Sequence, residues 1–278
     1  MLATREQAAP AAGASSVLWL VRHAERVDEH SLGREYTADD GPRWFDPELS
    51  VRRGDAMARL TGVKLASLLR LEQQAQPSTP LNFDGVVHAS PMVRTMQTAA
   101  ALVPALQSVG SDGSLLAEAA GVRRVFGLGE CTFACRKKLG GLGQMVKAGL
   151  ILSEEETLAT CGVESLFGTD GNQVEDFLET CIRLCSSSEG GGAGKHLVAV
   201  THREGIWQLA AERAGVDLAE AVGAAPYCVI AKFNVSAGGG AVTLDFVSGC
   251  RAWSKGCDFD QGSEQEWDTL FEASTVPT

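Results

Sequence analysis

Short apolar runs alternate with longer amphipathic stretches along this chain. Four of the runs are rich in Val, Ile and Leu, are bounded by glycine, proline or polar residues, and have the length of buried strands; they cover residues 17–21, 85–88, 197–201 and 228–233. Residues 242–247 alternate between apolar and polar side chains, and a glycine-rich stretch at 236–240 precedes them. This pattern predicts an antiparallel hairpin at the edge of a sheet.

Helical periodicity fills much of the chain between these runs. Apolar side chains recur every three or four positions, and they predict helices over residues 55–71, 92–102, 173–185 and 204–214. Residues 72–80 and the Ser- and Gly-rich residues 186–194 are predicted to be loops. Strands that alternate with helices are typical of the α/β class, in which helices connect parallel strands.

Composition and charge narrow the classes of function. The 278 residues are 45% hydrophobic, as in a folded protein with a sizeable core. The 24 basic and 35 acidic residues give a formal net charge of −11, which disfavours partners such as nucleic acid or an anionic membrane. No apolar run approaches the roughly 18 residues of a membrane span. We expect a cytoplasmic protein with a flexible tail at 1–15, a folded domain at 16–250 and an extension of undefined order at 251–278.

The eight cysteines indicate neither a metal centre nor a disulfide framework. Cys131 and Cys135 are four residues apart, as are Cys181 and Cys185, and neither pair has the CxxC spacing of a zinc site. Cysteines in a chain of this length without a secretory signal are typically reduced thiols. We therefore expect no bound metal.

Histidine and arginine gather where three of the predicted strands end. Arg22, His23 and Arg26 follow the first strand, Arg94 lies one helical turn beyond the second, and His202 follows the third. Open α/β sheets bind ligands beyond the carboxyl ends of their strands. Guanidinium groups offer bidentate hydrogen bonds to phosphate oxygens, and an unprotonated imidazole nitrogen is a nucleophile near neutral pH. The pattern predicts a phosphate site at this edge.

Four motifs, in the same order, resemble those of the histidine phosphatase (phosphoglycerate mutase-like) superfamily. They are Arg22-His23-Ala24-Glu25-Arg26, which resembles RHGE; Asp46-Pro47-Glu48-Leu49-Ser50 with Gly54; residues 90–99, which are similar to SPxxRTxQTA; and Thr201-His202. Residues 26–28 and 226–228 look most like the branch of the suppressors of T-cell receptor signalling. The resemblance spans residues 17–247 and implies a three-layer α/β/α sandwich with a mainly parallel mixed sheet.

The resemblance also implies a phosphomonoester hydrolase that uses no cofactor. His23 would attack phosphorus and form a phosphohistidine, His202 would stabilise charge in the transition state, and Glu130 would protonate the leaving oxygen. The phosphoryl oxygens would be held by three arginines: Arg22, Arg26 and Arg94. The expected partner is a phosphorylated small molecule, including phosphotyrosine-like compounds, or a phosphoprotein. Members of the superfamily are monomers or homodimers.

Three alternatives stay open in the sequence. Arg203, directly after the second histidine, either reaches the mouth of the site and binds an acidic substrate or points to solvent. Ala24 stands where glycine is usual, and its methyl group would lower activity if the backbone needed the freedom of glycine there. The rival functions are a phosphoglycerate mutase-type phosphotransferase and a phospholigand-binding protein without turnover.

Overall fold

The fold is built on a seven-stranded sheet with the strand order β4-β3-β2-β5-β1-β6-β7. The computed structural model describes residues 15–27, 46–50, 53–75, 81–109, 121–129, 152–161, 165–167, 176–186, 195–217, 227–236 and 239–248. The strands are β1 (Ser16–Arg22), β2 (Asn82–Ala89), β3 (Gly121–Arg124), β4 (Ser165–Phe167), β5 (Lys195–Thr201), β6 (Ile230–Val235) and β7 (Val242–Ser248).

The sheet is mixed and mainly parallel. β1 pairs with β5, β5 with β2, β2 with β3 and β3 with β4, all in parallel. β6 runs antiparallel to β1, and β7 runs antiparallel to β6 at the edge. The predicted edge hairpin is therefore confirmed, and its turn is closed by the backbone N–H of Ser236, which donates to the carbonyl of Ala241 at 2.9 Å.

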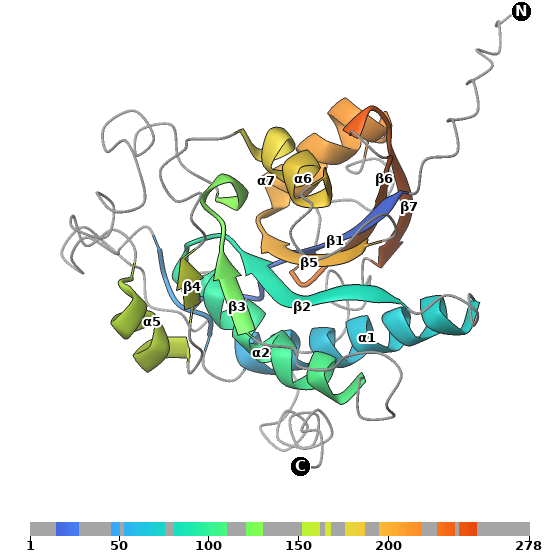
Figure 1. Ribbon diagram of the computed structural model, residues 1–278. Helices are drawn as coiled ribbons and strands as arrows, with labels where there is room; N and C mark the ends of the chain where they lie inside the picture. The colour runs from blue at the N-terminus through green and yellow to red at the C-terminus, as the bar shows by residue number, and fades with distance from the viewer. Residues whose placement is uncertain are drawn as a thin grey trace, which may run out of the picture.

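Helices cover both faces of the sheet (Figure 1). α1 (Arg53–Ala75) and α2 (Val93–Val109) pack on one face, and α6 (Phe177–Ser186) and α7 (Arg203–Leu209) pack on the other. A π-helical turn, Ala210–Ala214, continues α7; α5 (Glu154–Cys161) packs beside α2, and a short 3-10 helix, Phe126–Leu128, follows β3. The predicted three-layer α/β/α sandwich with a mainly parallel mixed sheet is confirmed.

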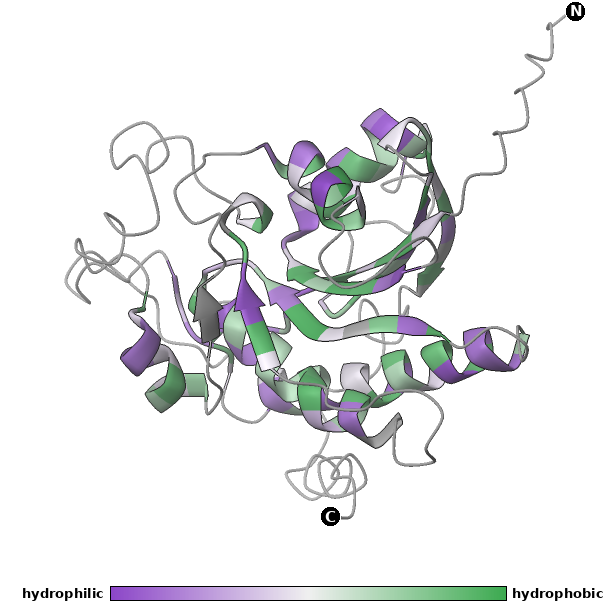
Figure 2. Ribbon diagram, viewed as in Figure 1, coloured by the Kyte–Doolittle hydropathy of each residue, from purple (hydrophilic) through white to green (hydrophobic). Residues whose placement is uncertain are grey.

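The central strand β1 shows why the sheet needs both helical layers. Its side chains are mostly buried, and successive residues point to opposite faces. Leu18 and Leu20 join the core under α6 and α7, whereas Trp19 and Val21 join the core under α1 and α2. Figure 2 shows apolar residues concentrated along the central strands and mixed with hydrophilic residues on α1. A strand that is apolar on both faces is stable only between two covering layers.

The end of α1 differs from the sequence prediction. The predicted loop over 72–80 is wrong at residues 72–75, because α1 continues to Ala75. The carboxylate of Glu72 pairs with the ammonium of Lys232 on β6 at 2.8 Å, and Oε1 of Gln73 accepts the N–H of Leu81 at 2.6 Å. These tertiary contacts hold a last turn that the local pattern does not favour. The other boundaries also move, with α2 extending to Val109 and β6 beginning at Ile230.

Periodicity misses three short elements, β3, β4 and α5, which have four, three and eight residues. Arg124, the last residue of β3, is buried and donates to the carbonyls of Leu152 and Ser153 and to the hydroxyl of Thr157. Burial lowers the pKa of Arg124 to about 10. A long-range contact of this kind stabilises an element whose own pattern is too short to be recognised.

Some predictions concern residues outside those that the structure describes. They are the tail at 1–14, the extension at 251–278, the loop residues 76–80 and 187–194, the first residues of the predicted helix at 173–175, and the proposed acid, Glu130. Within the described ranges, none of the helices has the combined length and apolarity that a membrane crossing requires.

Candidate active site

The carboxyl ends of three neighbouring strands, β1, β5 and β2, bring the predicted histidines and arginines together. His23 directly follows β1, and its backbone N–H donates to the carbonyl of Thr201 on β5 at 3.0 Å. Ser90 directly follows β2, and its N–H donates to Val200 of β5 at 3.0 Å. His202 directly follows β5 and precedes α7. The cluster lies where open α/β sheets bind ligands.

His23 and His202 lie side by side in the interior, with ring centroids 5.3 Å apart and an angle of 63° between the rings. Their exposed fractions are only 4% and 2%. Nδ1 of His23 lies 2.7 Å from the carbonyl oxygen of Ala24. Because a carbonyl can only accept, Nδ1 carries the proton, and Nε2 of the neutral ring keeps its lone pair. His23 is therefore held in the tautomer whose Nε2 is a nucleophile.

Arg94, in the first turn of α2, connects His202 to Asp46. Its Nη1 donates to Oδ1 of Asp46 at 2.9 Å, and its Nη2 donates to Nδ1 of His202 at 3.4 Å. Because Nδ1 of His202 accepts, its ring proton is on Nε2, which donates to the hydroxyl of Ser90 at 2.9 Å. Both oxygens of Asp46 also accept the N–H of Val93, at 3.1 and 2.9 Å. One buried carboxylate thus caps α2 and holds Arg94.

Burial and the nearby arginines keep both histidines neutral. Burial is the largest cause that holds the pKa of His23 and of His202 well below the usual 6.5, and the charge of Arg94 lowers both further. The charges of Arg22 and Arg26 act in the same direction, and the hydrogen bond from His23 to the backbone opposes them without reversing the shift. An anion bound here would favour the charged form of each ring. The electrostatics of the site therefore favour an anionic ligand.

Glu25 ties the end of β1 to the start of α1. Its carbonyl accepts the N–H of Ser50 at 3.0 Å, and the N–H of Val27 donates to the carbonyl of Glu48 at 3.0 Å. The carboxylate of Glu25 lies 3.2 Å from Nε of Arg53 and accepts the hydroxyl of Ser50 at 3.1 Å. Glu25 thus serves a structural role beside the two histidines.

Ala24 fits its position without the conformational freedom of glycine. It is fully buried, its N–H donates to Oγ1 of Thr98 at 3.0 Å, and its methyl group packs with Leu49 and Met57. Of the non-glycine residues that the structure describes, positive φ occurs at Cys228 alone. The backbone of Ala24 therefore lies outside the left-handed region that favours glycine.

Two other arginines predicted to bind substrate, Arg22 and Arg26, make different contacts from Arg94. Cζ of Arg22 lies 4.1 Å from the ring centroid of Tyr227, and Arg26 forms an isolated antiparallel bridge with Leu49. Both arginines lie close enough to lower the pKa of His23 and of His202. Arg22, Arg26 and Arg94 are thus brought to the histidine cluster.

Arg203 is held at the surface of α7. Its side chain, 39% exposed, donates to the carboxylate of Glu204 at 2.9 and 2.7 Å and lies over the ring of Trp207, 4.9 Å from the centroid. The structure thus joins Arg203 to neighbours on its own helix. Its predicted contact with substrate stays a prediction, as does the acid role of Glu130, which lies outside the described residues.

Three residues of the cluster had no role assigned from the sequence: Asp46, Ser90 and Tyr227. Asp46 and Ser90 belong to two of the motifs that resemble the superfamily, so the sequence marks both positions. Their contacts with Arg94 and His202 depend on the fold and cannot be read from the motifs. For Tyr227 the sequence offered only its place before a late strand. The described residues hold no group of three or more His, Cys, Asp or Glu side chains placed to bind a metal.

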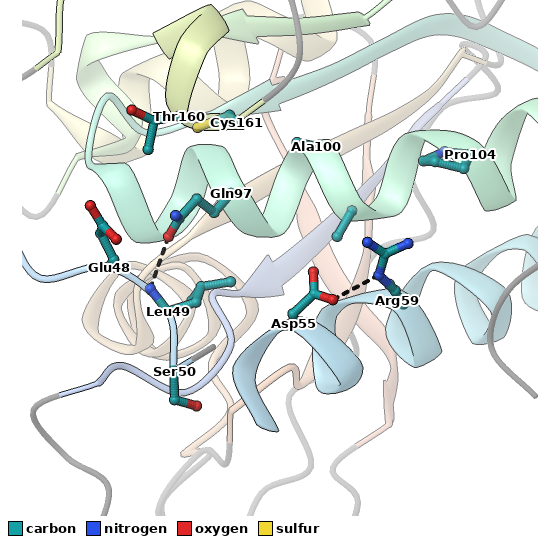
Figure 3. Close-up of a pocket in the computed structure, with 11 residues that line it drawn as sticks. Glu48, Leu49, Ser50, Asp55, Arg59, Gln97, Ala100, Pro104, Thr160 and Cys161 are labelled. Atoms are coloured by element: carbon teal, nitrogen blue, oxygen red, sulfur yellow. Dashed lines mark hydrogen bonds and ion pairs between the residues drawn. The ribbon is translucent and has the colours of Figure 1, made fainter. Parts of the chain in front are cut away.

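A separate pocket of about 330 Å³ is lined by residues of α1, α2 and α5 and by residues 48–50 (Figure 3). The histidines and arginines of the cluster are not among its lining residues. Oε1 of Gln97 accepts the N–H of Leu49 at 2.8 Å, and Asp55 accepts Nε of Arg59 at 2.8 Å. The contact between Gln97 and Leu49 fastens the segment that carries Asp46 to α2, and so the pocket wall supports the site.

Comparisons with known proteins give distant likenesses. No family model and no curated protein matches the chain. A mutant phosphoserine phosphatase from Entamoeba histolytica in complex with phosphoserine matches at 14% identity and a TM-score of 0.43, over 84% of this chain and 96% of that one. A mycobacterial glucosyl-3-phosphoglycerate phosphatase matches at 19% and 0.38, over 83% and 97%. A Plasmodium falciparum phosphoglycerate mutase matches at 14% and 0.38, over 84% and 90%.

Proposed function

We propose that this chain is a phosphomonoester hydrolase of the histidine phosphatase superfamily that works through a phosphohistidine on His23. The observation that carries the proposal is the fixed tautomer of His23, whose Nδ1 donates to the backbone of Ala24 and whose Nε2 keeps a lone pair. This nucleophile lies beside His202 and within the electrostatic reach of Arg94. A neutral imidazole among fixed cations suits attack on an anionic phosphorus centre.

The proposed reaction has two steps. First, Nε2 of His23 forms a bond to phosphorus as the ester P–O bond breaks, and the leaving oxygen takes a proton from Glu130, the acid predicted from the sequence. Arg94 and His202 stabilise the charge on the phosphoryl oxygens. Second, Glu130 accepts a proton from water as that water attacks phosphorus, the N–P bond breaks, and inorganic phosphate leaves with His23 neutral again.

The substrate class that we propose is a phosphorylated small molecule, including phosphotyrosine-like compounds, or a phosphoprotein, hydrolysed without a cofactor. The sequence at 26–28 and 226–228 supports placement in the branch of the suppressors of T-cell receptor signalling. A cytoplasmic monomer or homodimer is part of the same proposal.

Replacement of the nucleophile tests the function directly. We expect the purified full chain to hydrolyse p-nitrophenyl phosphate, and His23→Ala to lower kcat/KM by at least about a thousandfold, because without the nucleophile the covalent route is closed. His196→Gln is the matched control, since His196 is also a substantially buried histidine but lies against Trp19, away from the cluster. A His23→Ala variant with wild-type activity would exclude the proposal.

Trapping experiments separate the rival functions. Brief reaction with labelled phosphotyrosine should leave acid-labile phosphohistidine on the wild-type chain and none on His23→Ala. Vanadate binding without any turnover would overturn the hydrolase in favour of a phospholigand-binding protein. Conversion of 3-phosphoglycerate to 2-phosphoglycerate, in preference to release of inorganic phosphate, would overturn it in favour of a mutase.

A further inference from the structure

One aromatic ring, that of Tyr227, lies against two of the residues proposed to act on phosphate. Cζ of Arg22 is 4.1 Å from the ring centroid, and the ring centroid of His23 is 5.7 Å away at an interplanar angle of 54°. A guanidinium over an aromatic face is attracted by the electrons of that face. Its N–H groups lie in the guanidinium plane, where phosphoryl oxygens can accept from them. Tyr227 therefore restrains a donor and the nucleophile together.

The backbone next to this ring is in a strained conformation. Cys228 has φ of 57°, and it is the single non-glycine residue with positive φ in the described part of the chain. Such a conformation persists where surrounding contacts over-determine it. Cys228 is buried, and its N–H lies 3.4 Å from the carbonyl of His23, while Val229 accepts the N–H of Arg22 at 3.0 Å. The strained turn is thus tied to the same two residues that Tyr227 contacts.

The hydroxyl of Tyr227 adds no contact to this arrangement. Its oxygen is buried, and it has no hydrogen-bond partner among the residues that the structure describes. A buried hydroxyl without a partner disfavours the folded state. Phenylalanine at this position would keep each ring contact with Arg22 and His23 and would remove that unfavourable group.

We propose that the ring of Tyr227 is a positioning element of the phosphate site, which orients Arg22 toward the phosphoryl oxygens and His23 toward phosphorus. The inference rests on the proposed function. Arg203 over the ring of Trp207, at 4.9 Å, is a second arginine–aromatic pair in the described residues. Trp207 lies on α7 and packs against the core under α6 and α7, whereas Tyr227 packs against the group of residues around Ala24. Trp207 therefore provides a matched control for the loss of such a pair alone.

The experiment compares Tyr227→Phe, Tyr227→Leu and Trp207→Leu in the full chain, with kcat and KM for p-nitrophenyl phosphate, inhibition by inorganic phosphate, and Tm. We expect Tyr227→Leu to weaken phosphate inhibition by about tenfold and to lower kcat/KM by about 10- to 100-fold, because the cation–π contact and the orientation are both lost. Tyr227→Phe should stay within about threefold of wild type, with an equal or higher Tm. Trp207→Leu should leave inhibition by inorganic phosphate within about twofold, since its ring lies against Arg203, which pairs with Glu204 and is predicted to bind the acidic part of a substrate that inorganic phosphate lacks.

Each outcome bears on one proposal. Wild-type phosphate inhibition and kcat/KM in Tyr227→Leu would overturn the positioning role, and an equal loss in Tyr227→Phe would assign the effect to the hydroxyl and overturn the role of the ring. If Tyr227→Leu does not fold, Tyr227→Met, which keeps the bulk without the aromatic face, replaces it in the same assays. A wild-type chain without phosphatase activity would overturn the proposed function instead. Calorimetric phosphate binding then tests the positioning role: weaker binding in Tyr227→Leu supports it, and unchanged binding overturns it.

Discussion

Two clusters of this molecule combine histidine with cations: the buried site cluster of His23, His202 and Arg94, and a partly exposed second cluster of His196, Lys232, Glu72 and Asp245. In the site cluster, Arg94 lowers the pKa of both site histidines, adding to the effect of burial. In the second cluster, on the α1 face of the sheet, the ammonium of Lys232 lies 2.8 Å from Glu72 and 2.7 Å from Asp245. In the first cluster burial and the arginines lower the pKa of both histidines, whereas in the second the carboxylates of Asp245 and Glu72 outweigh burial and raise the pKa of Lys232.

This difference supports the proposed ligand site at the first cluster and a structural role for the second. Burial lowers the pKa of Lys232, but its hydrogen bonds with Asp245 and Glu72 outweigh burial and raise that pKa above the usual value. Its charge is therefore balanced by groups of the protein itself. In the site cluster Asp46 pairs with Arg94, yet burial and the charges of the arginines still keep the pKa of both histidines well below the usual 6.5. An anion bound beside the histidines would favour their charged forms, as the proposed phosphate site requires.

Asp46→Ala should have the largest effect on stability. The carboxylate is buried, pairs with Arg94 and caps α2, and loss of one partner of a buried pair costs about 3–5 kcal/mol. We expect the unfolding free energy in urea to fall by about 3 kcal/mol, with phosphatase activity falling as well. Asp245→Ala in the second cluster is the control; its side chain is 48% exposed, and we expect a loss below about 1 kcal/mol. Equal losses would contradict the contrast between the clusters.

His196 should make the second cluster sensitive to acid. The pKa of His196 is lowered to about 4, chiefly by burial. The charge of Glu72 raises this pKa and the charge of Lys232 lowers it. Unfolded histidine titrates near 6.5, so the unfolded chain binds the proton first, and the unfolding free energy falls as pH drops from about 6.5 to about 4. We expect this group to account for about 2 kcal/mol of that fall. His196→Gln should reduce the slope of stability against pH over this range, and an unchanged slope would contradict the assignment.

The parts of the molecule that could be predicted from the sequence are those with local causes. β1 was predictable because it is apolar on both faces, and His23 and His202 because each directly follows a strand. The role of Asp46 depends on Arg94, 48 residues away, and the last turn of α1 depends on Lys232, 160 residues from Glu72. Contacts of this kind leave no periodic trace, so a local pattern cannot reveal them.

Inorganic phosphate should distinguish the site histidines from His196. A bound anion favours the charged imidazole, and we expect saturating phosphate to raise the pKa of His23 and His202 by about one unit, equivalent to about 1.4 kcal/mol for each ring. The pKa of His196 should not change, because its neighbours are Glu72 and Lys232. Nitrogen-15 NMR of the imidazole rings measures all three, with His23→Ala and His196→Gln to assign the signals. Site histidines that titrate alike with and without phosphate would argue against an anion site.

Ala24→Gly should have the smallest effect, and it tests whether the alanine limits the nucleophile. The methyl group is fully buried against Leu49 and Met57, so its removal, together with the added freedom of glycine, should lower the unfolding free energy by about 1 kcal/mol. The hydrogen bond that fixes the tautomer of His23 uses only the backbone carbonyl of residue 24. We therefore expect kcat/KM to stay within about twofold of wild type in steady-state assays. A many-fold rise would show that the methyl group of Ala24 restricts the turn that aims His23.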